Sequence, residues 1–261
     1  MRSLTIEVLE SVPSTMDTAQ ERLQKGIVRL DDALPTPYAG LMALEQTAGR
    51  GQRGRVWSSR PGASLCATFY FRHGLDLPAE LSAVALLAGL AVAEALAVQV
   101  AASLSTADIG LKWPNDLLLD GKKVGGILIE TTRTAEGQTV ALIGLGLNIG
   151  AGAFPPELDS TAITLETAGV VITDSAALAA NIAGALRRQA EQFRQEGWAG
   201  LIARWRPWDR TAGRRFHTER DGIPLSGIAE GIDDAGRLLL RLPDKTLLSV
   251  GSASTLQEAL P

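Results

Sequence analysis

The feature that most limits the possible folds is a series of four strand-like segments between residues 109 and 146. Tight turns join them, and one turn holds Asp120-Gly121, a pair typical of β-hairpins. No helical pattern separates the segments, so neighbouring strands should pair directly. This disfavours a doubly wound parallel sheet, in which strands alternate with helices. The four segments are Ile109–Trp113, Leu117–Leu119, Val124–Thr131 and Thr139–Gly146.

Three further strands and three helices surround this series. The longest apolar stretch, Leu81 to Val98, contains Glu94 and predicts a core helix rather than a membrane span. Ser14 or Thr15 is the candidate cap of the first helix and Gly26 its stop. The predicted strands are Leu4–Leu9, Gly40–Glu45 and Ser64–Phe71. The predicted helices are Asp17–Lys25, Pro78–Val98 with Asp76 as a cap, and Asp174–Gln195.

From about Thr211 the pattern changes to short strands separated by turn residues. Four or five strands within about 50 residues are typical of a small β-barrel. We therefore expect an α+β protein, with a mixed or largely antiparallel sheet and packed helices in residues 1–210 and an SH3-like barrel in residues 211–261. The predicted barrel strands are Gly213–His217, Leu225–Ile232, Arg237–Leu242 and Leu247–Val250.

Composition excludes several classes of protein. A net charge of −4 is not the strongly basic footprint of a nucleic-acid binder. Cys66 is the single cysteine, which rules out an internal disulfide and fits a reducing compartment; within a strand it is typical of a small core residue. His73 and His217 lie far apart, so neither a metal-ligand cluster nor a catalytic triad has support. With no apolar signal segment at the N-terminus, we expect a soluble cytoplasmic protein without membrane or nucleic-acid partners.

The first candidate site is the glycine- and arginine-rich segment Gln46 to Trp57. Its glycines let backbone amides converge on an anion, and its arginines supply charge and forked donors. This chemistry suits a phosphate or an adenylate, but a solvated basic loop has the same composition. A P-loop is excluded because no Gly-Lys-Ser/Thr follows. A dinucleotide fingerprint is excluded because the strand Leu65–Phe71, not a helix, follows the G-x-G-x-x-G spacing.

A second candidate is the run Lys112-Trp113-Pro114-Asn115-Asp116. Its lysine follows a strand and suits a phosphate, while the aspartate suits Mg²⁺, a ribose or a lysine. The alternative is a surface turn in which Asn115 and Asp116 bond their own backbone and Trp113 belongs to the core.

Two further strands carry glycines that would let a ligand approach the backbone. In Lys122 to Glu130, two lysines precede Gly125-Gly126; without a ligand, this is a hairpin with lysines at its mouth. In Gly144 to Ile149, Asn148 suits an adenine edge, although a buried structural asparagine fits equally well.

In this order, the segments resemble the bacterial biotin protein ligase family, part of the biotin/lipoate ligase superfamily. Each motif is weak alone, but six in the same order are specific, and they span nearly the whole chain. The matching segments are Ser14-Thr15-Met16, Gln46 to Trp57, Lys112 to Asp116, Lys123 to Glu130, Gly144 to Asn148, and Gly227 to Asp233 with Gly236 to Leu240 in the tail.

The resemblance implies a biotin–[biotin carboxyl carrier protein] ligase that uses ATP and Mg²⁺ to make biotinyl-5′-AMP and then biotinylates a carrier lysine, with a homodimer possible. The implied biotin-binding residues are Ser14, Thr15, Met16, Gln46, Arg50, Gly51, Gln52 and Lys123. The implied nucleotide-binding residues are Arg50, Arg53, Trp57, Lys112, Asn115 and Asn148. The implied catalytic residues are Lys123, Arg50, Lys112 and Asp116.

Two departures from the family pattern lead to further expectations. Gln52 stands where the family often has Arg, so we expect weaker retention of the adenylate. The motifs begin at Ser14, which leaves no room for the DNA-binding helix-turn-helix of some members, so we expect a ligase and not a repressor.

Two alternative functions remain at this point. A lipoate or octanoate ligase or transferase uses the same scaffold, but needs a long apolar tunnel instead of groups that bind a ureido ring. A non-catalytic biotin or nucleotide sensor would bind the ligands without releasing pyrophosphate.

Overall fold

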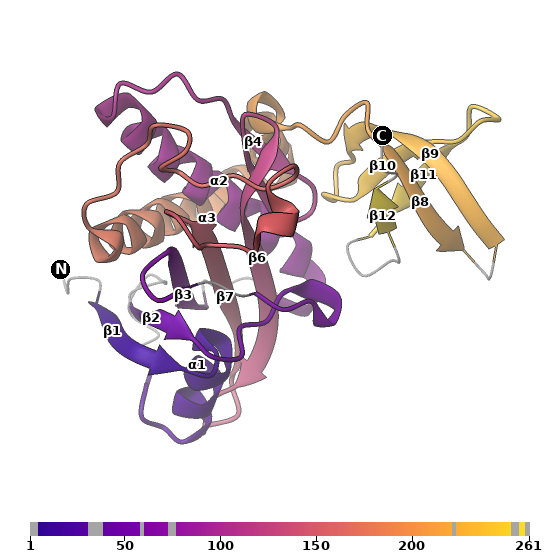
Figure 1. Ribbon diagram of the computed structural model, residues 1–261. Helices are drawn as coiled ribbons and strands as arrows, with labels where there is room; N and C mark the ends of the chain where they lie inside the picture. Colours follow the sequence, from indigo (N-terminus) through magenta and orange to yellow (C-terminus); the bar gives the residue numbers. More distant parts are fainter. Residues whose placement is uncertain are drawn as a thin grey trace.

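The computed structural model describes residues 5–30, 39–57, 60–72, 77–220, 223–251 and 256–258. It contains a larger sheet with packed helices and a smaller C-terminal sheet (Figure 1). The larger part consists of β1 (Thr5–Val12), α1 (Thr15–Gln24), β2 (Ala39–Gln46), η1 (Gln52–Gly54), β3 (Ser64–Phe71), α2 (Leu77–Ala102), β4 (Ile109–Lys112), β5 (Asp116–Leu119), β6 (Lys122–Arg133), β7 (Thr139–Asn148), η2 (Pro156–Leu158), α3 (Ser175–Trp205) and η3 (Arg206–Trp208). The smaller part consists of β8 (Arg215–Arg220), β9 (Ile223–Ile232), β10 (Leu238–Arg241), β11 (Leu247–Val250) and β12 (Leu256–Glu258).

The larger sheet has seven strands in the order β1-β2-β3-β7-β6-β5-β4. β1 and β2 are parallel, with α1 as the connection between them, and the other neighbours are antiparallel. The four strands β4 to β7 pair consecutively, as the series between residues 109 and 146 predicts. The α+β class with a mixed sheet is therefore confirmed.

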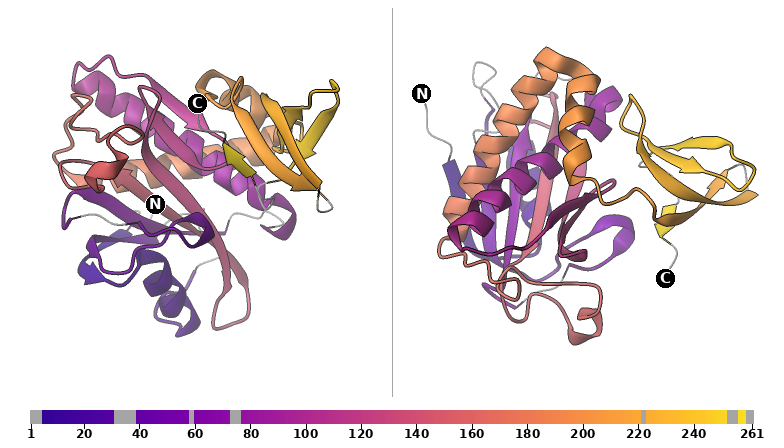
Figure 2. Two further views of the ribbon diagram at one scale, coloured as in Figure 1. Left: turned by 45° about the vertical axis from the view of Figure 1, so that its right-hand side comes forward. Right: turned by 90° about the horizontal axis from the view of Figure 1, so that it is seen from above.

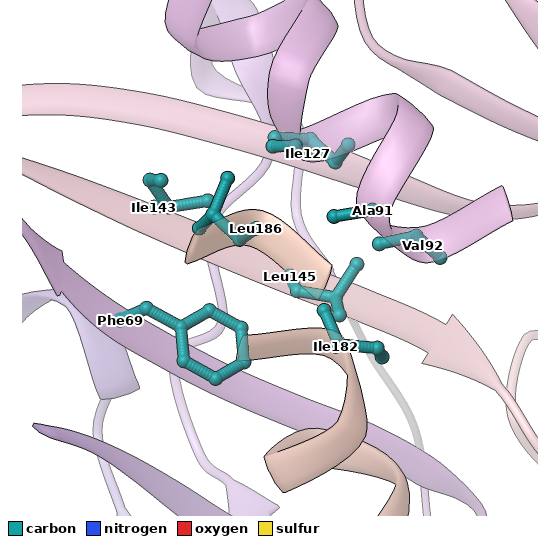
Figure 3. A pocket seen from close by; sticks show the side chains of 9 residues that line it. Phe69, Ala91, Val92, Ile127, Ile143, Leu145, Ile182 and Leu186 are labelled. Carbon is teal, nitrogen blue, oxygen red and sulfur yellow. The ribbon is translucent and has the colours of Figure 1, made fainter. Parts of the chain in front are cut away.

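The two long helices α2 and α3 lie side by side over one face of this sheet (Figure 2). In the close view of Figure 3, Phe69 and Leu145 of the sheet lie beside Ile182 of α3, and Leu145 also faces Val92 of α2. The space between them is about 10 Å³ and its lining is apolar throughout. This layer is therefore a close-packed core and not a ligand site.

Helix α2 is almost entirely apolar and packs against the sheet and α3, with Glu94 as a charged residue inside it. Within the described residues it is the one helix long and apolar enough to cross a membrane, over Leu81–Ala102. However, 72% of that window is buried inside the protein, which confirms the predicted core helix. Its predicted cap, Asp76, lies outside the described residues.

Helix α1 packs on the opposite face of the sheet and fixes the start of the site. Ala19 and Leu23 are fully buried there, in a cluster with Tyr70 of β3 and Leu142 of β7. Because side chains alternate along a strand, Phe69 and Phe71, the neighbours of Tyr70 in β3, point to the opposite face of the sheet and pack in the core beneath α2 and α3. The helix begins at Thr15, two residues before the predicted start at Asp17.

The predicted helix Asp174–Gln195 ends too early. Helix α3 continues to Trp205, with a break at Gly197, whose φ is 64°. Glycine adopts this left-handed conformation without steric cost. Beyond the break Trp205 is buried against Gly89 of α2, where a Cβ would lie 3.0 Å from its ring. A break in helical periodicity looks the same in the sequence as a helix end.

The smaller sheet has five antiparallel strands in the order β11-β10-β9-β8-β12, which confirms the predicted small C-terminal β domain. Its last strand, β12, was not among the four predicted strands. Phe216 and Leu240 of this sheet belong to the same buried cluster as α2 and α3, so the sheet shares a core with the larger part.

Candidate active site

Buried hydroxyl and amide groups form a neutral end of the site where β1 leads into α1. Ser14 caps α1 by accepting a hydrogen bond from Asp17 N at 3.5 Å. Thr15 donates its N–H and its hydroxyl to Gln46 Oε1, at 2.7 and 3.0 Å. Thr68 of β3 donates its hydroxyl to Thr15 Oγ1 at 2.9 Å. Three of the predicted biotin-binding residues are therefore brought together from separate segments.

Glycines on the same face of the sheet form a floor beside this neutral end. A Cβ at Gly144 would lie 2.8 Å from Met16 Sδ, and one at Gly146 would lie 2.6 Å from the Trp57 ring. Gly126 of β6 pairs directly with Gly146 of β7. Because none of these positions has a side chain, Met16 and Trp57 lie directly on the backbone of the sheet.

Cys66 faces this floor from β3, opposite Gly146. Burial raises the pKa of its thiol to about 11, and the neighbouring side chains of Trp57 and Gln46 offset only part of this effect. The thiol is therefore neutral near pH 7. This agrees with the prediction of a small core residue rather than a nucleophile.

Arg50 lies at the margin of the site between α1 and β6. Its guanidinium donates to Glu130 Oε1 at 2.8 Å and to Asp17 Oδ1 at 2.6 Å. These bonds, that to Glu130 above all, raise the pKa of Arg50. Its side chain is 41% exposed, so an arriving anion can exchange for these partners.

The glycines of the arginine-rich loop give it a tight shape. A Cβ at Gly49 would lie 2.3 Å from Trp57 O, so only glycine lets the two arms of the loop approach. Gly51 N donates to Arg55 O at 2.7 Å, and Gln52 begins the short helix η1. The side chain of Arg53 lies outside the described residues.

Two lysines converge on one carboxylate at the other end of the floor. Asp116 Oδ1 accepts from Lys123 Nζ at 2.5 Å, and Asp116 Oδ2 lies 2.9 Å from Lys112 Nζ. Burial alone would raise the pKa of Asp116, but the charges of Lys123 and Lys112 outweigh it and hold that pKa below its usual range. Burial lowers the pKa of Lys112, and its carboxylate partners more than reverse this. Three of the four predicted catalytic residues are therefore brought into one charged cluster, while the fourth, Arg50, pairs with Asp17 and Glu130 outside it.

The two candidate asparagines bind the main chain around this cluster. Asn115 Nδ2 donates to Ile127 O at 2.8 Å. Asn148, which is 3% exposed, donates to Ile163 O at 3.2 Å and to Lys123 O at 3.5 Å. Both side chains hold loops in place beside Lys123. Their contact with a nucleotide stays a prediction.

Strand β6 connects the two charged regions of the site. Lys123 is its second residue, and Lys123 Nζ lies 3.5 Å from the position of a Cβ on Gly126. Glu130, the partner of Arg50, lies on the same face of β6, about 13 Å from Gly126 at the usual rise per residue. Lys123 and Arg50 therefore border one stretch of the sheet, with the glycine floor and the Thr15–Gln46 pair beside it. An elongated ligand with a neutral end and an anionic centre fits this layout.

Two family models match the chain. The Biotin/lipoate A/B protein ligase family covers residues 8–148, and the Biotin protein ligase C terminal domain covers residues 213–254. The first match contains every predicted site residue, and the second falls on the smaller sheet. The chain belongs to the biotin protein ligase family.

Curated relatives are similar over most of the chain. The bifunctional ligase/repressor BirA of Salmonella typhimurium is 34% identical over 236 residues, which cover 90% of this chain and 69% of the relative. The biotin–[acetyl-CoA-carboxylase] ligase of Mycobacterium tuberculosis is 35% identical over 210 residues, 80% of this chain and 75% of the relative.

Solved structures of biotin protein ligases have the same fold. The Aquifex aeolicus protein in complex with biotin and ATP has a TM-score of 0.76 at 23% identity, covering 98% of this chain and 99% of that one. The Leishmania major protein in complex with biotinyl-5-AMP has a TM-score of 0.61 at 29% identity, covering 95% and 99%.

Several polar residues around this ligase-family site were not predicted from the sequence. Thr68 and Cys66 lie on the site face of β3, which the strand alternation could have indicated once the face of the sheet was known. Asp17 and Glu130 pair with Arg50, and no local pattern reveals that pairing. Glu258 forms an ion pair with Lys112 from β12, a strand that the sequence pattern does not predict.

A surface hollow of about 510 Å³ adjoins the loop after Asn148. Arg60, Phe154 and Thr164 are among the residues that line it. Loop residues Ile163 and Leu165, on either side of Thr164, bond Lys123 O and Asn148 O through their N–H groups. The hollow therefore lies next to the segment that holds Lys123.

Proposed function

We propose that this protein activates biotin with ATP and transfers the biotinyl group to a lysine of a biotin carboxyl carrier protein. The observation that carries the proposal is the presence of two chemically different ends on one sheet face. Neutral groups of the buried Thr15 and the partly buried Gln46 lie at one end, and the Lys123–Asp116–Lys112 cluster lies at the other. Biotinyl-5′-AMP has the same division, with a neutral ring at one end and an acyl phosphate further along.

The neutral end suits the ureido ring of biotin. This ring carries a carbonyl acceptor and two N–H donors, and each of these groups costs about 1–3 kcal/mol if it is buried without a partner. Ser14 and Thr15 supply hydroxyl groups and Gln46 supplies an amide. The two hydroxyl residues are buried, at 1% and 3% exposure. Met16, which is 4% exposed, adds a buried apolar side chain beside them.

The charged groups suit the first chemical step. The biotin carboxylate oxygen attacks the α-phosphorus of ATP, the bond to the bridging oxygen breaks, and pyrophosphate leaves. This step brings anions together, so it depends on cations that stabilise the developing charge. We assign this role to Lys123, with Lys112 and Arg50 in support. Gly51, Gln52 and Arg53 would wrap the carboxylate and the phosphate.

The nucleotide would extend from this point toward the loop after β7. Trp57 offers an aromatic surface on the glycine floor, and Asn115 and Asn148 hold the surrounding main chain. The hydroxyl of Ser64, which pairs with Asn148 in the sheet, is buried without a hydrogen-bond partner among the described residues. An unpaired buried group of this kind fits a polar ligand at this position.

Mg²⁺ fits this site as a companion of the ATP phosphates. The described residues contain no group of three His, Cys, Asp or Glu side chains that could hold a metal ion. Mg²⁺ is usually bound by one or two carboxylates together with substrate phosphates, and Asp116, which contacts the Lys123 that we assign to the reacting centre, is the carboxylate that would share it. When bound, the ion would neutralise charge on the phosphates.

In the second step the amine of the carrier lysine attacks the carbonyl carbon, the bond to the phosphate oxygen breaks, and AMP leaves. Asp116 could receive the amine proton or orient the amine. Since the pKa of Asp116 lies below its usual range, it is a weak base, and orientation is the role we assign to it, while the amine proton passes to the departing AMP phosphate or to solvent.

The partner and assembly follow from the same proposal. A carrier domain can dock by adding a strand to a sheet edge, and β1 and β4 are the edge strands of the larger sheet. The same edges could form a homodimer. We infer two units, residues 1–210 for catalysis and residues 211–261 for the C-terminal barrel, acting in the cytoplasm without nucleic acid or membrane partners.

A lipoate or octanoate ligase is the main competing function. The match to the Biotin protein ligase C terminal domain and the hydroxyl-lined end at Thr15 favour biotin. Titration calorimetry with biotin and with lipoate separates the two, and tighter binding of lipoate would overturn the proposal.

Pyrophosphate release tests the reaction itself. With biotin, ATP and Mg²⁺ we expect release that depends on biotin and disappears in Lys123→Ala. Binding of both ligands without release would instead identify a sensor.

A further inference from the structure

The motif Lys112 to Asp116 is held from the C-terminal part of the chain. Trp113 N donates to Thr211 Oγ1 at 2.8 Å, and Trp113 Nε1 donates to Gly236 O at 2.9 Å. Just before the motif, Leu111 O accepts from Arg210 N at 2.8 Å. Trp113 is 3% exposed, so it is part of the core, as one reading of the motif suggests.

The contact nearest to the chemistry comes from Glu258 on β12. Its Oε2 lies 3.0 Å from Lys112 Nζ, and its Oε1 accepts from Arg214 at 2.6 Å. Lys112 in turn contacts Asp116, whose other oxygen holds Lys123. One continuous series of ion pairs therefore runs from the C-terminal sheet to the lysine that we assign to the reacting centre.

The position of Lys112 explains why such support matters. Lys112 ends β4, which pairs with β5 on one side and on the other is bridged at Leu111 by Asp209 alone among the described residues. The side chains of Lys112 and Asp116 are 18% and 17% exposed, so the surrounding medium screens their charges weakly. A single carboxylate shared by two ammonium groups holds each less firmly than two carboxylates would.

We propose that Glu258 is a positioning residue of the ligase reaction, which acts through Lys112 to keep Asp116 and Lys123 in place. Without its charge, Lys112 has Asp116 as its one remaining ion-pair partner among the described residues. Asp116 would then shift toward Lys112 and hold Lys123 less closely. The C-terminal sheet thus contributes to adenylation itself, although Glu258 does not touch the substrate. This inference rests on the proposed function.

The test uses Glu258→Gln in the full-length protein, because glutamine keeps the shape and removes the charge. We expect kcat for biotin-dependent pyrophosphate release to fall about five- to tenfold, the size of coupling that neighbouring charges show, with KM for biotin within about twofold of wild type. Glu230→Gln is the matched control, since Glu230 pairs with Arg241 on the exposed surface of the same sheet. It should behave as wild type.

A double-mutant cycle separates positioning from a general loss of structure. If Glu258 acts through Lys112, Glu258→Gln should have no further effect on kcat in a Lys112→Met background. Additive effects, or a loss that accompanies lower thermal stability, would overturn the inference. Glu258→Asp keeps the charge on a shorter side chain and should restore part of the lost rate.

The result also distinguishes this inference from the proposed function. Wild-type protein that releases no pyrophosphate would overturn both. Active wild type together with a Glu258→Gln variant that matches Glu230→Gln would overturn the positioning role alone.

Discussion

The neutral end and the charged end of the site differ in how they satisfy their polar groups. At the neutral end the buried Thr15 and Thr68 and the partly buried Gln46 bond each other through uncharged groups. At the charged end Lys123 and Lys112 share one carboxylate, and at the margin of the site Arg50 holds two others. A ligand at the neutral end meets a prearranged set of donors and acceptors, whereas an anion at the charged end must displace or share existing ion pairs.

This difference suggests that one end of the site determines the affinity for biotin and the other determines the rate of the reaction. Hydrogen bonds that are already oriented contribute to ground-state binding, since they need no rearrangement. Cations aimed at developing charge contribute mainly to the transition state. The neutral end should therefore determine the dissociation constant of biotin, and the charged end should determine kcat. Each prediction below tests that division.

The largest expected effect is at Lys123. Lys123→Ala removes the cation assigned to the reacting centre and leaves Asp116 with Lys112 alone. We expect biotin-dependent pyrophosphate release to fall by about 10²- to 10³-fold, as when one donor that stabilises a transition state is lost. Biotin binding by calorimetry should change little. Lys122→Ala, at the adjacent exposed lysine, is the control, and an equal loss in both variants would contradict the assignment.

The next effect is expected at the neutral end. Thr15→Val removes the hydroxyl that donates to Gln46 and leaves the Thr68 hydroxyl without its acceptor. We expect biotin to bind about 10- to 100-fold more weakly, since an unpaired buried polar group costs about 1–3 kcal/mol.

Calorimetry with biotin measures the effect of Thr15→Val, and KM for ATP should stay within about twofold because the change is remote from the phosphates. Thr218→Val, at another buried threonine in the C-terminal sheet, is the control. A parallel rise in KM for ATP would show that the two ends are not separable.

These two ends differ in how far the sequence predicts them. Local signals predict the Ser14 or Thr15 cap of α1, the glycine strands and the antiparallel hairpins from β4 to β7, whereas the biotin-binding role of Ser14 and Thr15 follows from the family resemblance. The partners of the cations are not predictable in this way. Glu130 lies 80 residues from Arg50, and Glu258 lies 146 residues from Lys112. Such pairs form only when elements that are distant in the sequence pack together, and the spacing of residues along the sequence does not predict that packing.

A smaller effect is expected at Glu130, the main partner of Arg50. Glu130→Gln removes one carboxylate that competes with the ligand for the guanidinium. We expect KM for ATP to fall about two- to fivefold, within the range of a partly exposed ion pair. Glu45→Gln, at a carboxylate that accepts from Ser11 away from the site, is the control. A rise in KM would show that Glu130 positions Arg50 instead of competing for it.

The smallest effect is expected at Gln52, which lies next to Gly51 at the start of η1. A neutral amide provides one charge fewer against the adenylate phosphate than the arginine that the family often has. Gln52→Arg should therefore slow the release of biotinyl-5′-AMP by a few-fold, about the strength of one screened charge pair, without changing biotin affinity. Single-turnover chase experiments measure the release rate. We assign Gln52 to the charged side of the site, so slower release together with tighter biotin binding would contradict the division between the two ends. Equal release rates in wild type and Gln52→Arg would show that Gln52 has no role in retaining the adenylate.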